Sequence, residues 1–116
     1  MNVKTNKSNH IVVKALTAKF GFQNMSIAAK IALNYTLQLN KVFNLNELKD
    51  LDNSGMEYTE DTLFGGRDNN VLYRALFNQQ YGRILTDDEF YRLVKIHLDW
   101  GLERLREEIL DTDRGR

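Results

Sequence analysis

Residues able to do acid–base or metal chemistry are few and far apart in this sequence. His10 and His97 are its only histidines, and it has no cysteine. Neither histidine belongs to a His-x-x-x-His or Glu-x-x-His pair, the spacings that put two metal ligands on one helix face. Asp99 follows His97 by two residues, so the two side chains do not share a helix face and cannot act as a pair. We therefore expect His97 to be a helix-face residue near an interface. We therefore predict no catalytic residue, no metal site, no cofactor and no activity as an enzyme.

Two adjacent glycines, Gly65 and Gly66, are the feature closest to a phosphate-binding motif. They precede a helical pattern, and the N-terminus of a helix attracts anions. A phosphate loop also needs further glycines at fixed spacing or a Gly-Lys-Ser/Thr ending, and the sequence has neither. Because glycine adopts positive φ at little cost, the pair predicts a turn between packed elements rather than a nucleotide site.

The acidic residues of the second half fit structural roles. Thr86 and Glu89 have the spacing of a capping box, and the acids of that turn suit the helix dipole. Further along, carboxylates alternate with bases in a pattern typical of a solvated, salt-bridged helix face: Glu103, Arg104, Arg106, Glu107 and Glu108.

The distribution of charge is more informative than the net charge of zero. Residues 1–49 hold seven lysines and one acid, a net charge of +6, and residues 50–116 hold nine bases and fifteen acids, a net charge of −6. A basic half attracts a polyanion, whereas an acidic half suits a protein partner or keeps the chain soluble. A solvated surface with uneven charge is the alternative interpretation.

Helical periodicity dominates the chain, which predicts an all-α (mainly α-helical) single domain over residues 1–116. With 42% hydrophobic residues the chain can bury one core. We expect a strand or arm over residues 2–7 and helices over 9–20, 26–43, 69–81 and 87–110. The segment 44–66 is less regular and contains a turn at 52–55.

Apolar spacing assigns an inner side to three of these helices. In the first, Ser8 is the expected N-cap, and the inner residues are Ile11, Ala15 and Leu16. In the third, Asp68 or Asn69 is the expected cap, and the inner residues are Val71, Leu72, Ala75, Leu76 and Phe77. In the last helix, a heptad-like set predicts packing: Leu98, Leu102, Leu105 and Ile109.

The first forty residues predict a ribbon-helix-helix-like element, which binds DNA as a two-fold pair with its strands in the major groove. The expected DNA-binding residues are Lys4, Lys7, Lys14, Lys19 and Lys30. All bases of this half are lysines, and bidentate contacts to guanine favour arginine, so we expect contacts to the duplex backbone with little sequence specificity. The alternative is a helical hairpin whose lysines only keep it soluble.

The second helix predicts self-association. Ile27, Ile31 and Tyr35 form one stripe, whereas Leu33 and Leu37 lie partly off it. A helix that is apolar on more than one side is buried on more than one side. We therefore expect a homo-oligomer, either a dimer or a tetramer, with Ile27, Ile31 and Tyr35 at its interface.

The N-terminal sequence MNVKTNKSNHIVVK contains no long apolar run. It therefore predicts neither a signal peptide nor a membrane span, and the cytoplasm is the expected location.

Four segments, in this order and spacing, resemble the DndE family of bacterial DNA phosphorothioation proteins: SIAAKIALNYTLQLN, LDNSGMEYTEDTLFGG, YRALFNQQYG and KIHLDWGLERL. The resemblance covers about residues 8–110. Such proteins act with other Dnd proteins, namely a cysteine desulfurase, an iron–sulfur protein and an ATPase, to replace a non-bridging phosphate oxygen by sulfur. The resemblance implies a small helical subunit that forms oligomers and binds DNA through a basic surface, in which Lys14, Lys19 and Lys30 fall.

The resemblance also implies that Leu63 and Phe64 fill the core and that Gly65 turns the chain. Because the chain has no cysteine, it cannot carry sulfur on a thiol. The sequence thus predicts a DNA-binding accessory subunit of a phosphorothioation complex, with duplex DNA, intact or nicked, and other phosphorothioation proteins as partners. A ribbon-helix-helix transcription regulator and an assembly adaptor without DNA contact stay open as alternatives.

Overall fold

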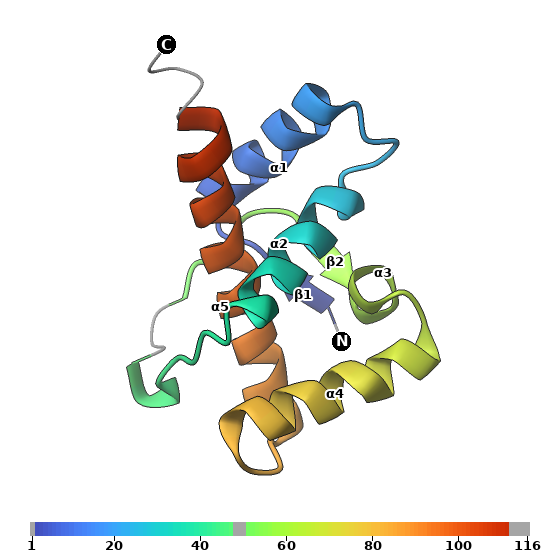
Figure 1. Cartoon of the computed structure of the whole chain (residues 1–116), viewed down its shortest axis with the longest axis vertical. Coiled ribbons are helices and arrows are strands. Elements are labelled where there is room, and N and C mark those ends of the chain that lie inside the picture. Colours follow the sequence, from blue (N-terminus) through green and yellow to red (C-terminus); the bar gives the residue numbers. More distant parts are fainter. Residues whose placement is uncertain (1, 48–50, 112–116) are drawn as a thin grey trace.

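A computed structural model describes residues 2–47 and 51–111 and shows a helical domain with one small sheet (Figure 1). In chain order its elements are β1 (Asn2–Lys4), α1 (Lys7–Phe20), α2 (Ser26–Gln38), the 3-10 turn η1 (Leu45–Glu47), β2 (Glu57–Thr59), α3 (Glu60–Phe64), α4 (Arg67–Tyr81), α5 (Asp87–Leu105) and the π-helical turn η2 (Arg106–Asp111). The predicted mainly α-helical fold class is confirmed.

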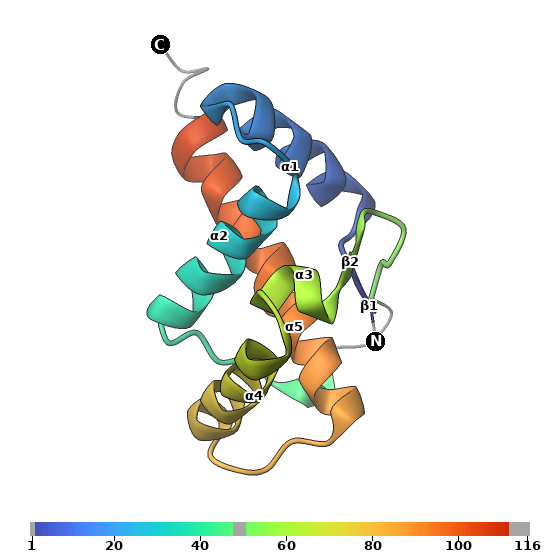
Figure 2. The same cartoon turned by 90° about the vertical axis from the view of Figure 1, so that its right-hand side faces the viewer.

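Helix α5 is the spine of the domain. It runs along the molecule, with α1 and α2 beside its C-terminal half and α4 beside its first turns (Figures 1 and 2). Thr86 and Glu89 form the predicted capping box at its start. Leu98, Leu102 and Leu105 are buried as predicted, and Ile109 is partly buried against the same core.

Helix α2 lies close against α5 because small residues separate the two backbones. Ala28 and Ala32 are buried there. The Thr36 hydroxyl lies 3.0 Å from the carbonyl oxygen of Ala32 and 2.9 Å from that of His97. A Cβ atom at Gly101 would lie only 2.3 Å from the Ala32 carbonyl oxygen, so this crossing requires glycine.

The short N-terminal strand is present, and its partner comes from the same chain. β1 pairs antiparallel with β2, and three pairs of residues face each other: Asn2 with Thr59, Val3 with Tyr58, and Lys4 with Glu57. In a ribbon-helix-helix protein the N-terminal strand pairs with that of a second copy. The ribbon-helix-helix-like arrangement therefore stays a prediction, and one edge of β1 is already occupied within the chain.

The Gly65-Gly66 pair forms the turn between α3 and α4. Gly65 ends α3 at a φ of 90°, and Gly66 precedes α4 at a φ of 123°. Both angles favour glycine. Leu63 and Phe64, directly before the turn, are buried in the core as expected.

Three helix boundaries differ from the prediction. The N-cap of α1 is Asn6 rather than Ser8, because the Asn6 Oδ1 accepts the backbone N–H of Asn9 at 2.8 Å. Helix α2 ends at Gln38 rather than at residue 43, since Asn40 adopts a left-handed φ of 54°. Asparagine tolerates this conformation better than most residues. Helix α4 also begins earlier than expected, with Gly66 at its N-cap position instead of Asp68 or Asn69.

The predicted inner face of α4 is wrong. Only Phe77 is buried, and the other expected core residues are exposed: Val71 (68%), Leu72 (54%), Ala75 and Leu76 (43%). The helix instead turns an aromatic side inward, where Tyr73 stacks on Phe64 at 4.5 Å and Phe77 packs edge-on against Phe90 at 5.4 Å. Aromatic rings bury more apolar area than aliphatic side chains, which favours this orientation. Ile11, expected on the inner face of α1, is likewise 64% exposed.

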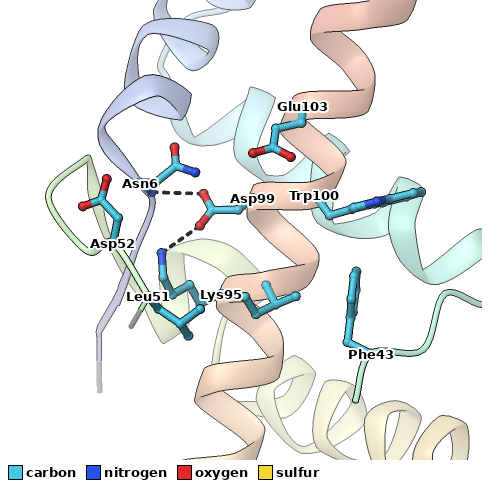
Figure 3. A pocket seen from close by; sticks show the side chains of 9 residues that line it. Asn6, Phe43, Leu51, Asp52, Lys95, Asp99, Trp100 and Glu103 are labelled. Atoms are coloured by element: carbon cyan, nitrogen blue, oxygen red, sulfur yellow. Dashed lines mark hydrogen bonds and ion pairs between the residues drawn. The ribbon is translucent and has the colours of Figure 1, made fainter. Parts of the chain in front are cut away.

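A buried polar network fastens the N-terminal arm to α5 (Figure 3). The Asp99 Oδ1 accepts the backbone N–H of Asn6 at 3.1 Å and the Asn9 amide at 2.8 Å, and its Oδ2 accepts the Lys95 ammonium at 2.7 Å. The same ammonium donates to the carbonyl oxygen of Lys4 at 2.9 Å. Lys95 and Asp99 are 6% and 7% exposed, so each charge depends on these partners.

Removing Asp99 should therefore cost more stability than removing Lys95. Asp99→Leu leaves an ammonium and two N–H donors without their acceptor, and we expect a loss of about 3–5 kcal/mol. Lys95→Met leaves Asp99 with its other two donors, and we expect about 1–3 kcal/mol. Urea unfolding at neutral pH measures both, and a larger loss for Lys95→Met would contradict the network.

His97 lies in the middle of the core rather than near an interface as predicted. Its side chain is fully buried, and the rings of Phe43 and Phe77 pack edge-on at 4.9 Å and 5.1 Å. The Tyr81 hydroxyl accepts the backbone N–H of Phe43 at 3.1 Å and lies 2.8 Å from Nε2 of His97. Burial lowers the pKa of His97 to about 4 from its usual 6.5, so the ring is neutral at pH 7.

Acid should destabilise the fold through His97. The unfolded histidine binds a proton near pH 6.5 and the folded one only near its lowered pKa of about 4, so stability falls as the pH drops through this window. The full loss is about 3 kcal/mol. His97→Gln keeps an acceptor for Tyr81 and should remove this contribution. Urea unfolding of the parent protein and of His97→Gln at pH 6.5 and pH 4 measures the loss. An equal loss of stability in both proteins would contradict the role of His97.

Candidate nucleic-acid interface

Four of the five predicted DNA-binding lysines lie on β1 and α1. Lys4 is exposed on β1, and Lys7, Lys14 and Lys19 are exposed on α1. Lys30 is set apart on α2, where it is partly buried and lines a hollow with Ile31, Tyr35 and Leu105. The basic strip, defined as Lys4, Lys7, Lys14 and Lys19, is therefore the part of the predicted site that the fold brings together on consecutive elements.

Helix α1 presents two of these lysines on one outward face. Lys7 and Lys14 are separated by seven residues, nearly two helical turns, so their side chains share a side of the helix. Ile11 lies between them and is also exposed. The opposite side of α1 packs inward through Val12 and Leu16, which are buried. In the described residues, Lys7 and Lys14 make no ion pair, so both charges face solvent.

Two acids from the second half of the chain lie beside the basic strip, which sequence reasoning missed. Glu57 faces Lys4 across the β1–β2 pair, and both residues are exposed. The Asp52 carboxylate accepts the backbone N–H of Lys7 at 3.1 Å. Hydrogen bonds from Ser54 and then from this N–H lower the pKa of Asp52, so it is ionised at pH 7. These carboxylates weaken the positive field at the β1 end of the strip more than at Lys14.

The predicted oligomer stripe on α2 is open to solvent in the single chain. Ile31 is 44% exposed, and Ile27 and Tyr35 are partly buried. The Tyr35 hydroxyl lies 3.0 Å from both carboxylate oxygens of Glu108, and this hydrogen bond raises the pKa of the tyrosine. Helix α2 is thus buried on one side within the chain, and its apolar outer side stays free for another molecule.

Residues 2–47 and 51–111 can also be judged for a metal site and for a membrane-spanning helix. No group of three or more His, Asp or Glu side chains gathers there in a way that could hold a metal ion. Among the helices of these ranges, none combines the length and the apolar character needed to cross a bilayer.

Comparison with known proteins assigns the chain to a family. No curated protein matches it significantly. The family model described as DNA sulphur modification protein DndE matches residues 2–111, which include every helix and strand of the described fold. Because the match extends over nearly the whole sequence, the chain belongs to the DndE family of DNA sulphur modification proteins.

Proposed function

We propose a function for this protein within the role in DNA sulfur modification that its family membership supports. In this proposal, the protein is a DNA-binding accessory subunit of a phosphorothioation complex in the cytoplasm, without catalysis of its own. It contacts the duplex backbone through Lys4, Lys7, Lys14, Lys19 and Lys30. The observation that carries the proposal is the outward face of α1, where Lys7 and Lys14 point into solvent without a carboxylate partner in the described residues.

The chemistry of the strip favours backbone contacts over base reading. Lysine is a compact point charge that suits a phosphate, whereas the planar fork of arginine suits the edge of guanine. No arginine occurs in residues 1–49. Phosphate contacts position a protein on DNA but carry no sequence information. A transcription regulator with a strong operator preference is therefore the weaker alternative, and the β1–β2 pairing within the chain also disfavours it.

An assembly adaptor without DNA contact is the second candidate function, and the outer face of α4 favours it. Val71, Leu72 and Leu76 are exposed on that helix, and no element of the described residues covers them. Exposed apolar patches of this kind mark protein interaction sites. Such an adaptor would bind other phosphorothioation proteins equally well at high salt and would ignore DNA.

Neutralising two lysines of α1 should weaken DNA binding and reduce its dependence on salt. Each phosphate contact contributes roughly one unit to the slope of log affinity against log salt, so Lys7→Gln with Lys14→Gln should lower the slope by about two units. Fluorescence anisotropy with intact duplex, nicked duplex and single-stranded oligonucleotides measures the slope.

The matched control is Lys41→Gln, which removes a lysine that lies over the ring of Trp100 instead of on the basic strip. It should leave the slope within a few tenths of the parent value. An unchanged slope in the double variant would reject the basic strip, and no binding to any oligonucleotide at low salt would favour the adaptor.

We also propose that Ile27, Ile31 and Tyr35 form the interface of a homo-oligomer. Ile31→Asp puts a charge on the exposed stripe of α2, so it should reduce the mass in solution to that of one chain while the helical circular dichroism is kept. Ile11→Asp is the control, since Ile11 is exposed on α1 outside that stripe. Light scattering after size-exclusion chromatography decides, and an unchanged mass for Ile31→Asp would place the interface elsewhere.

A further inference from the structure

One side of α5 forms the floor of a pocket of about 270 Å³ (Figure 3). Ile96, Asp99, Trp100 and Glu103 have the spacing of one helix face and all line it. Three lining residues come from segments before other elements: Asn6 directly precedes α1, and Leu51 and Asp52 lie before β2. Phe43 lines the pocket from the loop after α2. In Figure 3 the aromatic rings lie on one side of α5 and the polar residues on the other.

The charges of this pocket are predominantly negative. Asp52, Asp99 and Glu103 contribute three carboxylates, and Lys95 is the one cation among the lining residues that the structure describes. Lys95 and Asp99 neutralise each other through their 2.7 Å contact. Asp52 is held ionised by hydrogen bonds, and Glu103 has no ion-pair or hydrogen-bond partner for its carboxylate in the described part of the chain. Among the described lining residues, two negative charges thus remain without a counter-charge.

The two aromatic residues that line the pocket, Phe43 and Trp100, also favour a cation. Trp100 and Phe43 pack edge to face at 6.2 Å, and two cations of the chain already use their rings. The Lys41 ammonium lies 5.2 Å from the centre of the Trp100 ring, and the Arg104 guanidinium lies 5.7 Å from it. Arg104 is paired with Glu107 and Glu108 outside the pocket. Cations gather on such rings because the π face is negative.

We propose that this pocket binds an arginine side chain of a protein partner. A guanidinium is planar, donates two parallel hydrogen bonds to a carboxylate and stacks on aromatic rings, and the pocket offers both kinds of surface. The carboxylate of Glu103, which has no partner within the described residues, is the expected acceptor, and Asp52, Phe43 and Trp100 line the same pocket. Phosphate and nucleic acid are disfavoured by the same carboxylates. The inference rests on the proposed role within a complex of phosphorothioation proteins and on the expectation from the sequence that the acidic half of the chain suits a protein partner.

The single tryptophan of the chain makes the pocket directly observable. Because Trp100 is the only tryptophan, tryptophan fluorescence, excited at a wavelength that tyrosine does not absorb, reports on this site alone. We expect N-acetyl-arginine amide to change it saturably, with a Kd on the order of 1 mM for so small a probe. N-acetyl-citrulline amide has the same shape without the charge and should cause no saturable change.

Glu103→Gln should raise the Kd for N-acetyl-arginine amide about tenfold, as expected for the loss of a charged acceptor. Glu57→Gln is the matched control, since it removes the same charge from an exposed site outside the pocket and should leave the Kd unchanged. An equal response to the citrulline probe, or an unchanged Kd in Glu103→Gln, would overturn the proposal.

The same samples separate this inference from the proposed DNA binding. If the arginine probe binds as expected and duplex DNA does not bind at low salt, the DNA-binding role fails and the pocket assignment stands. If duplex DNA binds and the arginine probe gives no saturable signal, the pocket assignment fails and the DNA-binding role stands.

Discussion

The N-terminal arm and helix α5 meet at the buried carboxylate of Asp99. Its oxygens accept the backbone N–H of Asn6, the Asn9 amide and the Lys95 ammonium, and Lys95 in turn holds the carbonyl oxygen of Lys4. These bonds act together with the β1–β2 pairing, the buried side chain of Val3 and the hydrogen bonds between Thr5 and Met56 to hold the strand and the first turn of α1 in place. The network therefore aligns the basic N-terminal arm with helix α5, and three of its residues, Asn6, Lys95 and Asp99, also line the neighbouring pocket.

Folding reduces the separation of charge that the sequence shows. Glu57 is brought opposite Lys4, and Asp52 is brought to the start of α1. The field of the basic half is thus strongest along α1 and weakest at β1, although both carry exposed lysines. Glu103, which has no ion-pair partner among the described residues, lines a pocket on α5 together with Asp52, Phe43 and Trp100. One small domain then presents a cationic helix face suited to a polyanion and an anionic pocket suited to a basic side chain.

Features that depend on neighbouring residues, such as caps and turns, could be predicted from the sequence. The side of a helix that packs inward and the contacts between distant residues could not. The capping box at Thr86, the glycine turn after Phe64 and the leucine spacing of α5 depend on neighbouring residues, and the structure confirms all three. The inner face of α4 was mispredicted because aliphatic and aromatic residues alternate around that helix, and packing against Phe64 and Phe90 decides between them. Partners distant in sequence, such as Asp99 with Asn6, leave no periodic signal, so neither the network nor the pocket could be foreseen.

Mapping a DNA duplex onto the protein by NMR is the most direct test of the role given to the basic arm. Backbone amide shifts of the isotope-labelled protein would be followed while an intact or a nicked duplex is added at low salt. The basic strip predicts shifts concentrated in residues 4–20, with α4 and the acidic face of α5 unaffected. Shifts concentrated on α4 or around Glu103, with residues 4–20 unmoved, would contradict DNA binding through the lysines of α1.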